Sequence, residues 1–262
     1  MVDLKQVPDY VPGHNLLAGK NVIITAAAGT GIGFAVAKKC LEEGASILIS
    51  DIHEGRLAEA KEKLIHETGG TVHSCLCNVT VQADVDALFA AAEKAFGAID
   101  VVINNAGLGG TADLVDMKDE EWAIVLDVTL NGCFRINRAA MQHMKAGDGG
   151  VIVNNASVLG WRAQKGQSHY AAAKAGVMAL TRCAAIEGAE FGVRVNAVAP
   201  SLAMHPFLHK VTSKELLAEL EAKEAFGRGS EVWEQANIMV FLASGYSSYL
   251  TGEVISSSSQ RA

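Results

Sequence analysis

Residues 21–33 read N-V-I-I-T-A-A-A-G-T-G-I-G, a short apolar run that passes directly into closely spaced glycines. The β-branched start predicts a strand, and the residues from Phe34 to Glu43 predict a helix. Glycines permit a tight turn and let backbone N–H groups approach a pyrophosphate, and the N-terminus of the helix adds partial positive charge. Such a loop can also be a purely structural turn. Its position between a strand and a helix is, however, the context that a dinucleotide-binding motif requires.

Short apolar runs alternate with helical patterns over nearly the whole chain. Strands are expected at Asn21–Thr25, Ser46–Ser50, Thr71–Leu76, Val101–Asn104, Val151–Asn154, Val193–Val198 and near Glu253–Ser256. The helical spacing of Val81, Val85, Leu88, Ala92 and Phe96 predicts a helix over residues 80–97 that covers one face of the sheet. This alternation predicts the α/β class, with a parallel seven-stranded sheet and helices on both faces in a single doubly wound Rossmann domain. We expect an N-terminal arm at residues 1–19 and the catalytic domain at residues 20–262.

The composition limits the class of protein. Half of the 262 residues are hydrophobic and 19% are charged, which suits a sheet buried on both faces. A net charge of −7 without a run of Lys or Arg argues against a nucleic-acid or anionic-membrane partner. We expect a cytoplasmic protein, because no apolar stretch is long enough to span a bilayer and the N-terminus lacks the apolar core of a signal peptide.

The five cysteines are an odd number scattered through apolar segments, so we expect reduced thiols rather than disulfides. The C-x-C spacing of Cys75 and Cys77 on a strand-like run puts both side chains on one face, so the two could form a metal or redox pair. No second Cys/His cluster follows them at ligand spacing, which favours buried thiols.

Asp51 follows the second predicted strand, near the spacing of about twenty residues from the glycine loop at which an acidic residue meets the adenosine ribose. A carboxylate there accepts hydrogen bonds from the ribose hydroxyls and repels a 2′-phosphate. No Lys or Arg stands in the loop or just after Asp51, so the sequence favours NAD over NADP. The alternative interpretation is a solvated aspartate at a strand end.

Ser157, Tyr170 and Lys174 form the candidate catalytic group. Tyr170 and Lys174 are four residues apart, so on a helix they share one face. A phenol has a pKa near 10. For the phenol to act as an acid or base near pH 7, its pKa must fall by roughly three units, which corresponds to about 4 kcal/mol of stabilisation of the ionised form. The cation of Lys174, and an oxidised nicotinamide ring, would supply part of this, while Ser157 can hold a substrate oxygen without ionising. Taken alone, the pair could equally be an ordinary surface pair on a helix.

From about Leu16 to Gln260 the chain resembles the short-chain dehydrogenase/reductase family. The resemblance rests on ordered motifs: T-A-A-A-G-T-G-I-G at 25–33, N-N-A-G at 104–107, S-V-L-G-W at 157–161, Y-A-A-A-K at 170–174, R-V-N-A-V-A-P at 194–200, and F-L-A-S with Y-L-T-G-E-V within 241–254. It implies an oxidoreductase that interconverts a secondary alcohol and a ketone by hydride transfer. Ser157, Tyr170 and Lys174 would be catalytic, and the enzyme would be a homotetramer built partly through the segment Ala171–Glu190.

The resemblance also implies a set of cofactor-binding residues, namely Ala27, Gly29, Thr30, Gly31, Ile32, Asp51, Asn78, Val79, Asn104, Ala106, Gly107, Lys174, Pro200, Ser201, Leu202, Ala203 and His205. It places a variable substrate loop, or lid, at residues 202–228. The residues expected to face the substrate are Leu108, Leu159, Trp161, Arg162, Met204 and Phe207.

The lid mixes apolar residues with Lys210, Lys214 and Lys223, and Trp161, Arg162 and Lys165 would add an aromatic wall and positive charge. Such a site suits an apolar substrate with an anionic handle. The alternative is that the apolar residues pack the lid itself and the lysines are solvated.

Four features depart from the family pattern. The glycine loop is one residue longer than usual and Ala26 occupies the position of its first glycine, so we expect Gly29 to take over the turn. Thr129 stands at the usual catalytic asparagine, with Asn131 two residues later on another helix face. The family asparagine also acts through its backbone carbonyl, so the proton relay could survive at Thr129.

The remaining departures lie elsewhere along the predicted cofactor site. Asn78 replaces a common aspartate, and Pro200-Ser201 replaces a proline-glycine pair. His205 stands where a threonine often meets the cofactor. His205 and His209 have a spacing that suits metals, but no third ligand accompanies them in sequence, so we expect no metal.

Longer stretches indicate a substrate class. V-N-N-A-S-V-L-G-W-R-A-Q at 153–164, S-H-Y-A-A-A-K at 168–174 and S-S-Q-R-A at the C-terminus resemble bacterial oxidoreductases that act on ring-bearing acyl-CoA thioesters in steroid C/D-ring breakdown. We therefore expect a small-molecule partner, a bicyclic CoA thioester. A looser likeness points to 3-oxoacyl-carrier-protein or acetoacetyl-CoA reductases.

Two further alternatives belong to other classes of protein. A catalytically silent Rossmann cofactor-binding protein is suggested by the altered positions at Ala26 and Thr129, although the presence of Ser157, Tyr170 and Lys174 argues against it. A methyltransferase would offer no reason for the serine and the tyrosine–lysine pair.

Overall fold

The computed structural model describes residues 3–206, 208 and 213–259. Its main feature is a seven-stranded parallel sheet in the order β3-β2-β1-β4-β5-β6-β9. The strands are β1 (Asn21–Ile24), β2 (Ser46–Asp51), β3 (Val72–Leu76), β4 (Val101–Asn104), β5 (Gly150–Asn155), β6 (Val193–Pro200) and β9 (Val254–Ser257). The predicted fold class is confirmed, and the strand bounds agree with the sequence prediction to within two residues.

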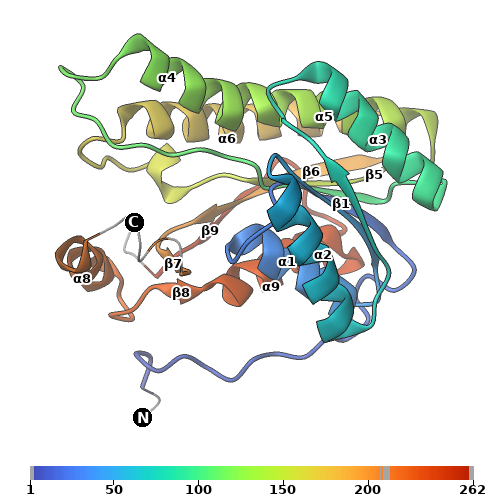
Figure 1. Cartoon of the computed structure of the whole chain (residues 1–262), viewed down its shortest axis with the longest axis horizontal. Helices are drawn as coiled ribbons and strands as arrows, with labels where there is room; N and C mark the ends of the chain where they lie inside the picture. Colours follow the sequence, from blue (N-terminus) through green and yellow to red (C-terminus); the bar gives the residue numbers. More distant parts are fainter. Residues whose placement is uncertain (1–2, 207, 209–212, 260–262) are drawn as a thin grey trace.

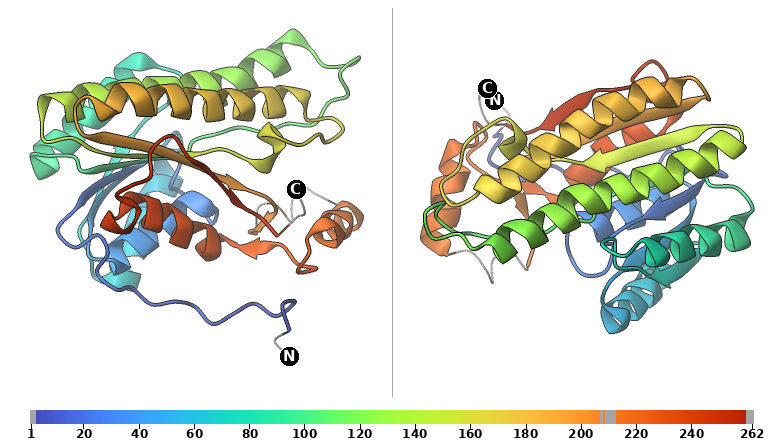
Figure 2. Two further views of the ribbon diagram at one scale, coloured as in Figure 1. Left: turned by 180° about the vertical axis from the view of Figure 1, so that it is seen from behind. Right: turned by 90° about the horizontal axis from the view of Figure 1, so that it is seen from above.

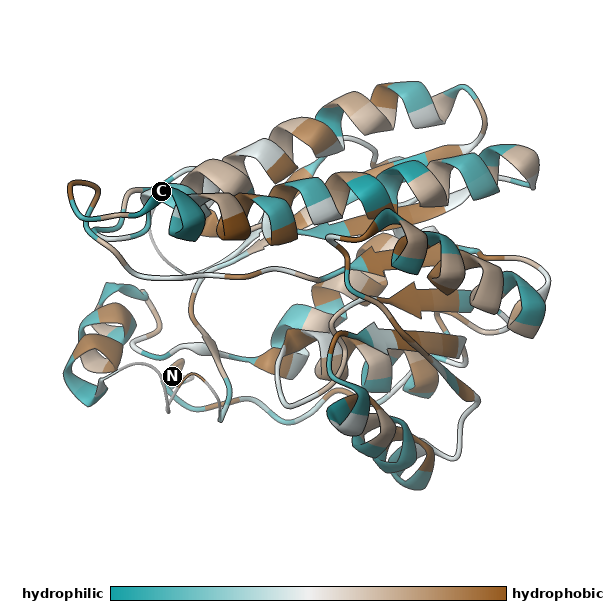
Figure 3. Cartoon of the chain, turned by 45° about the horizontal axis from the view of Figure 1, so that its top comes forward, coloured by the Kyte–Doolittle hydropathy of each residue, from teal (hydrophilic) through white to brown (hydrophobic). Residues whose placement is uncertain are grey.

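Helices cover both faces of the sheet, as Figure 1 shows. One face carries α1 (Ile32–Glu42), α2 (Glu54–Thr68) and α9 (Val232–Ala243), and the other carries α3 (Gln82–Phe96), α5 (Gly132–Ala146) and α6 (Ser168–Ala189). A further helix, α4 (Asp119–Leu126), leads into α5. Because the central strands are buried on both faces, they read as nearly continuous apolar runs rather than as alternating patterns. Figure 3 shows them as the most hydrophobic layer of the molecule.

The strand order places the candidate site. The chain runs from β1 outward to β3 and then returns to β4 beside β1, so connections leave β1 and β4 toward opposite faces. A crevice forms at such a switch point, outside the carboxyl ends of the strands. The register pairs Ile24 of β1 with Ile49 of β2 and Ile103 of β4, so these strands end at the same level.

The segment predicted as a lid is closed at its base by two short strands. β7 (Ala203–Met204) pairs in parallel with β8 (Ser230–Glu231), and α8 (Lys214–Lys223) lies between them in the chain. Strands β7 and β8 were not predicted from the sequence, because two residues are too few to show a periodic pattern. Phe207, His209 and Lys210 of the predicted lid lie outside the described residues.

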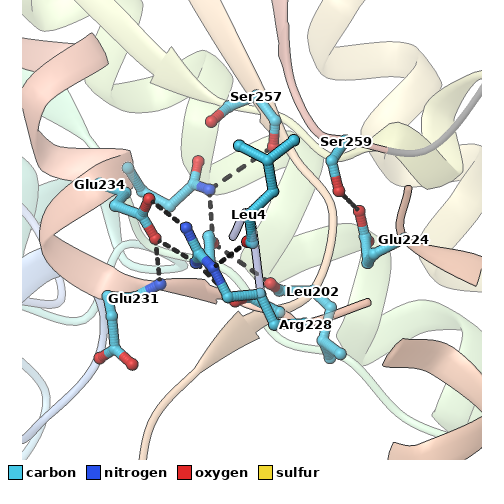
Figure 4. A network of polar contacts seen from close by, with 11 residues as sticks. Leu4, Leu202, Glu224, Arg228, Glu231, Glu234, Ser257 and Ser259 are labelled. Atoms are coloured by element: carbon cyan, nitrogen blue, oxygen red, sulfur yellow. Dashed lines mark hydrogen bonds and ion pairs between the residues drawn. The ribbon is translucent and has the colours of Figure 1, made fainter. Parts of the chain in front are cut away.

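Three distant segments hold the base of the lid (Figure 4). The Arg228 guanidinium donates to both carboxylate oxygens of Glu234 on α9, at 2.7 and 2.9 Å, and to the carbonyl oxygen of Leu4 at 3.4 Å. Near the other end of the chain, Ser259 Oγ donates to the Glu224 carboxylate at 2.7 Å.

The arm at the start of the chain lies along α1 and α9 and extends toward the lid (Figure 2). The buried Glu43 carboxylate accepts hydrogen bonds from the backbone N–H groups of His14 and Leu16 at 2.7 and 2.9 Å. The Tyr10 ring meets that of Trp233 on α9 edge-on, at 5.3 Å between centroids. Among the helices of the described chain, none combines the length and apolar character needed to cross a membrane.

Candidate active site

The structure brings Ser157, Tyr170 and Lys174 together at the carboxyl edge of the sheet. Ser157 follows β5 and its hydroxyl accepts a hydrogen bond from Leu159 N at 3.2 Å, which caps the 3₁₀ turn η2 (Val158–Gly160). Tyr170 and Lys174 lie in the first turns of α6. The Lys174 ammonium is 5.5 Å from the centre of the Tyr170 ring and donates to the Asn155 carbonyl oxygen at 2.5 Å.

Ser157 and Tyr170 line one cavity of about 250 Å³. Its wall combines apolar and polar side chains, and the remaining lining residues are Val158, Leu159, Arg162, Ala163, Gln164, Ser201, Leu202, Leu220 and Lys223. Leu220 and Lys223 belong to α8, so the lid helix forms one side of the cavity. A carbonyl or hydroxyl that enters the cavity can therefore meet Ser157 and Tyr170 together.

The predicted substrate residues are distributed unevenly. Leu159 and Arg162 line the catalytic cavity, whereas Trp161 lines an adjoining hollow. Met204 packs against Gly229, where an added Cβ would lie 2.7 Å from Met204 Cγ. Phe207 lies outside the described residues. Leu108 belongs to a glycine-rich loop that crosses the start of α6.

This loop, residues 107–110, lies directly over the candidate catalytic side chains. A Cβ added at Gly107 would lie 3.4 Å from Lys174 Nζ, and one at Gly109 would lie 3.8 Å from the Tyr170 ring. Gln167 holds the loop by donating to the Gly110 carbonyl oxygen at 2.7 Å. Gly109 and Gly110 were not among the predicted site residues. The run G-L-G-G after N-N-A could have indicated a close approach of backbone.

Thr129 lies in a π-helical turn, η1 (Asp127–Asn131), which joins α4 to α5. π turns within helices are frequent at functional sites. The buried Thr129 hydroxyl accepts from Leu108 N at 2.9 Å and donates to Leu108 O at 3.0 Å, so its side chain holds the loop over Lys174. Asn131 is exposed and donates to Asp127 at 3.2 Å, on a different face as expected.

The glycine loop is shaped by an alanine as well as a glycine. Gly29 has a φ of +113°, but Ala26 also adopts a left-handed conformation, with φ of +51°. The expectation that Gly29 replaces the turn of the first glycine is therefore incomplete, because Ala26 retains a turn that costs an L-residue roughly 1–2 kcal/mol. Asn105 Nδ2 donates to the carbonyl oxygens of Thr25 and Ala26 at 3.2 and 3.1 Å and stabilises this conformation.

A chain of hydrogen bonds joins the glycine loop to the candidate catalytic lysine. Asn155 Nδ2 donates to Asn105 Oδ1 at 2.8 Å, and the Asn155 carbonyl oxygen accepts from Lys174. Only a glycine fits at position 33, because a Cβ there would clash with Ala26 O at 2.3 Å and with Asn105 Nδ2 at 2.6 Å. Asn105 and Asn155 were not predicted as site residues. Both asparagines could have been found in the sequence, because each is a polar residue at the end of an apolar strand.

Asp51 ends β2 and is 8% exposed. Its carboxylate accepts from the backbone N–H groups of Ala28 and His53 at 3.3 and 3.1 Å. Burial raises the pKa of this carboxyl above its ordinary value, against the opposing effects of the Ala28 N–H and Arg56. The Arg56 guanidinium in the first turn of α2 lies 4.0 Å from Asp51. This cation was not predicted from the sequence; the available signal was an arginine in the first turn of a helix that begins three residues after Asp51.

The side chains of several predicted cofactor residues make contacts within the protein. Asn104 is 2% exposed and donates to Cys133 O at 3.1 Å, and Val79 packs against Gly132. Asn78 Oδ1 accepts from Thr80 N at 3.1 Å and from Thr80 Oγ1 at 2.9 Å. The side chains of Asn104 and Val79 are therefore engaged in hydrogen bonding and packing within the protein.

The other predicted cofactor residues lie at the ends of β1, β4 and β6. Gly31 is the N-cap of α1, whose first residue is Ile32, two residues before the predicted start. The backbone N–H of Ala106 donates to Thr25 Oγ1 at 3.0 Å. After β6 come Ser201, Leu202, Ala203 and His205, and Leu208 N donates to His205 Nδ1 at 3.3 Å. Within the described ranges, no three His, Cys, Asp or Glu residues gather as a metal site, and His209 lies outside them.

Comparisons with known proteins agree with this arrangement. A family profile described as enoyl-(acyl carrier protein) reductase matches residues 26–258. A crystal structure of a short chain dehydrogenase from Mycobacterium smegmatis superposes with a TM-score of 0.89 at 54% identity, covering 99% of this chain and 100% of that one. The chain belongs to the short-chain dehydrogenase/reductase family of NAD(P)-dependent oxidoreductases. The resemblance inferred from the motifs is thereby confirmed.

Two relatives of known activity are similar to this chain over most of its length. The chain is 58% identical over 260 residues, 99% of both chains, to the (5R,7aS)-5-hydroxy-7a-methyl-1-oxo-2,3,5,6,7,7a-hexahydro-1H-indene-carboxyl-CoA reductase of Mycobacterium tuberculosis. It is 38% identical over 239 residues to the 3-oxoacyl-(acyl-carrier-protein) reductase of Thermotoga maritima, covering 91% of this chain and 96% of that relative.

Replacing Asn105 with alanine should weaken cofactor binding by about tenfold, equivalent to about 1.4 kcal/mol. The substitution removes both hydrogen bonds to the glycine loop and leaves the Asn155 amide without its acceptor. Fluorescence titration of NADH measures the Kd. Asn131→Ala, which alters an exposed amide, is the control, and an unchanged Kd in Asn105→Ala would contradict this role.

Proposed function

We propose that Ser157, Tyr170 and Lys174 catalyse the interconversion of a secondary alcohol and a ketone. The observation that carries this proposal is that Ser157 and Tyr170 line the same cavity, with the Lys174 ammonium beside the Tyr170 ring. Ser157 orients the substrate oxygen by a hydrogen bond. Tyr170 takes the hydroxyl proton during oxidation and returns a proton to the oxygen during reduction.

Lys174 places a positive charge beside Tyr170, with its ammonium 5.5 Å from the centre of the ring, so the two side chains interact electrostatically. The near-complete burial of Lys174 strengthens this interaction, since water screens it little. Thr129 acts as a positioning residue for the loop over Lys174, because its hydroxyl is fully engaged with the Leu108 backbone. A bound nicotinamide cofactor supplies or accepts the hydride.

The crevice suits such a cofactor. The closely packed glycine at position 33 and the left-handed Ala26 form a turn where backbone can approach a pyrophosphate at the start of α1. Gly29, Thr30, Gly31 and Ile32 would hold the phosphates, and Asp51 the adenosine ribose. The residues from Pro200 to Ala203 would hold the nicotinamide end.

Tyr170→Phe should lower kcat by at least about a hundredfold, since it removes only the hydroxyl that transfers the proton. Circular dichroism and thermal unfolding should change little. Tyr246→Phe, at a residue that is 77% exposed, is the matched control. Turnover close to that of the unaltered enzyme would exclude Tyr170 as the acid/base.

We propose NAD as the preferred cofactor. The Asp51 carboxylate repels a 2′-phosphate, whereas Arg56 would attract one. Asp51 ends the strand and is held by two backbone N–H groups, while the Arg56 side chain is 52% exposed and screened by water. We therefore expect the repulsion of a 2′-phosphate by Asp51 to outweigh its attraction by Arg56.

Asp51→Ala should shift relative affinity toward NADPH by at least about tenfold, or about 1.4 kcal/mol, because Arg56 then acts without an opposing charge. Fluorescence titration of NADH and NADPH gives both Kd values. The paired variant Arg56→Ala should not shift the preference in this direction. Equal or tighter binding of NADPH by the unaltered protein would refute the electrostatic argument.

We propose a bicyclic acyl-CoA thioester as the substrate. Support comes from the 58% identity to an indene-carboxyl-CoA reductase over the whole chain. The cavity adds apolar walls from Leu159, Leu202 and Leu220 to the cations of Arg162 and Lys223, which suits an apolar body with an anionic handle. The alternative is a 3-oxoacyl thioester, which the 38% identity to a 3-oxoacyl-carrier-protein reductase favours.

Side-by-side kinetics decide between these substrates. A bicyclic hydroxyacyl- or oxoacyl-CoA should be turned over with a higher kcat/KM than acetoacetyl-CoA, and its free acid should be a much poorer substrate than the thioester. A clear preference for acetoacetyl-CoA would reject the bicyclic substrate while leaving the catalytic group unaffected.

We also propose that the protein is cytoplasmic and assembles as a homotetramer. Within each chain we propose an arm at residues 1–19, a catalytic domain at residues 20–262 and a substrate lid at residues 202–228. An apolar hollow of about 430 Å³ between α5 and α6, lined in part by Phe134, Leu180 and Phe191, supports contact between copies. All five cysteines are free thiols, which suits a reducing compartment.

A further inference from the structure

Arg228 connects three separate parts of the chain at the base of the proposed lid (Figure 4). Its guanidinium donates to the Glu234 carboxylate on α9, to the Gly229 carbonyl oxygen at 3.0 Å, and to the Leu4 carbonyl oxygen of the arm. A planar guanidinium with several fixed donors can hold three acceptors at once, whereas the ammonium of a lysine acts as a point charge. The arm, α9 and the end of the lid are therefore joined through one side chain.

The residues after Arg228 lie against a wall of the catalytic cavity. Ser230 donates to the Leu202 carbonyl oxygen twice, from its backbone N–H at 2.8 Å and from Oγ at 3.2 Å. A Cβ added at Gly229 would lie 3.1 Å from Leu202 Cγ. Leu202 lines the cavity, while Arg228 is not among the described residues that do so. A displacement of Arg228 would therefore move a wall of the cavity without removing any group from it.

The arm is anchored to α1 and α9 before it reaches the lid (Figure 2). The buried Lys39 ammonium donates to the Val11 carbonyl oxygen, and the Tyr10 hydroxyl donates to the Glu42 carboxylate. The Tyr10 ring also packs edge-on against Trp233 of α9. These contacts fix the arm around residues 10 and 11, and the preceding residues extend from this anchor to Arg228.

Beyond the anchor, the arm lies outside the hydrophobic core. Residues 3–10 are all exposed, and Pro8 and Asp9 line a hollow of about 510 Å³ whose other walls include Phe226 and Arg228. The Lys5 side chain lies over Gly227, where an added Cβ would be 3.3 Å from Lys5 Cε. The first residues of the arm therefore bury little surface of their own, and they meet the rest of the chain at the end of the lid.

We propose that the arm holds the lid in place over the catalytic cavity, with Arg228 as the positioning residue where the two meet. The inference rests on the proposed assignment of this cavity as the substrate site. The hydrogen bonds that hold Lys174 and the glycine loop run through Asn105 and Asn155, apart from the arm. Loosening the arm should therefore weaken substrate binding while chemistry and cofactor binding are kept.

The first test removes residues 2–7, which deletes Leu4 and Lys5 and keeps the anchor at Tyr10. The KM for the bicyclic oxoacyl-CoA, or for acetoacetyl-CoA if only that thioester is turned over, should rise about fivefold, the effect of losing one modest contact. The kcat and the Kd of NADH, measured by fluorescence titration, should stay nearly unchanged.

Substitutions at Arg228 test the junction itself. Arg228→Ala should raise the KM by about tenfold or more, because it releases the arm and α9 together. Arg228→Lys keeps the charge without the planar fork, so its KM should lie between those of Arg228→Ala and the unaltered enzyme. Removing residues 2–7 from Arg228→Ala should raise the KM no further, because the arm acts through Arg228.

Limited proteolysis with trypsin gives a readout that does not depend on turnover. In the truncated chain and in Arg228→Ala, cleavage after the exposed Lys214 and Lys223 of α8 should be at least about threefold faster, because a loosened lid opens more often. Lys20→Ala is the control. It breaks a 2.8 Å ion pair with Asp100 at the opposite edge of the sheet and should leave the KM and the cleavage of α8 unchanged.

The outcomes separate this inference from the proposed function. An unchanged KM in the truncated chain would overturn the role of the arm, whether or not α8 is cleaved faster. A raised KM accompanied by an equal loss of kcat and of NADH affinity would also overturn it, since that pattern indicates general disturbance of the fold. If the unaltered enzyme turned over neither thioester while α8 of the truncated chain was cleaved faster, the proposed substrate would fail and the arm would still hold the lid.

Discussion

The buried ammonium of Lys174 imposes the constraint on which the site depends. A charge removed from water is tolerated only where polar groups replace the lost hydration. The Asn155 carbonyl oxygen supplies such a group, and the Asn155 side chain continues through Asn105 to the glycine loop. The same set of hydrogen bonds therefore holds Lys174 in place beside Tyr170 and shapes the turn at Ala26.

A second polar network lies beneath this one in the protein interior. Asn154 Oδ1 accepts from Asn137 at 2.8 Å and from Asn104 at 3.3 Å, and Asn154 Nδ2 donates to Thr181 at 3.0 Å. Satisfied networks of this kind stiffen a core because each partner would be costly to leave unpaired. Burial also raises the pKa of the neighbouring Cys133 thiol to about 12, so this thiol stays neutral near pH 7 and adds no negative charge beside Lys174. Strands β4 and β5 and helices α5 and α6 are thus held in one arrangement.

The segment proposed as a substrate lid depends on a different group of contacts. Arg228 holds the pKa of Glu234 below its ordinary value, and the ion pair ties the base of the lid to α9. The arm contributes through Leu4, and the paired strands β7 and β8 bring the two ends of the lid together. These contacts are separate from the Asn105–Asn155 chain, so changes in residues 202–228 can alter the cavity at Ser157 and Tyr170 while the glycine loop keeps its shape.

The sequence by itself determined the α/β class, the seven strands and the shared helical face of Tyr170 and Lys174. Each of these follows from the spacing of residues close together in the chain, which periodicity reports directly. The tertiary structure alone decided that Asn105 meets Asn155, that Thr129 binds the loop at Leu108, and that β7 pairs with β8. These contacts join segments about twenty to fifty residues apart, and they depend on the order in which the strands pack. The shape of the hollow beside Trp161 likewise depends on how separate loops meet, and no local pattern of residues encodes that.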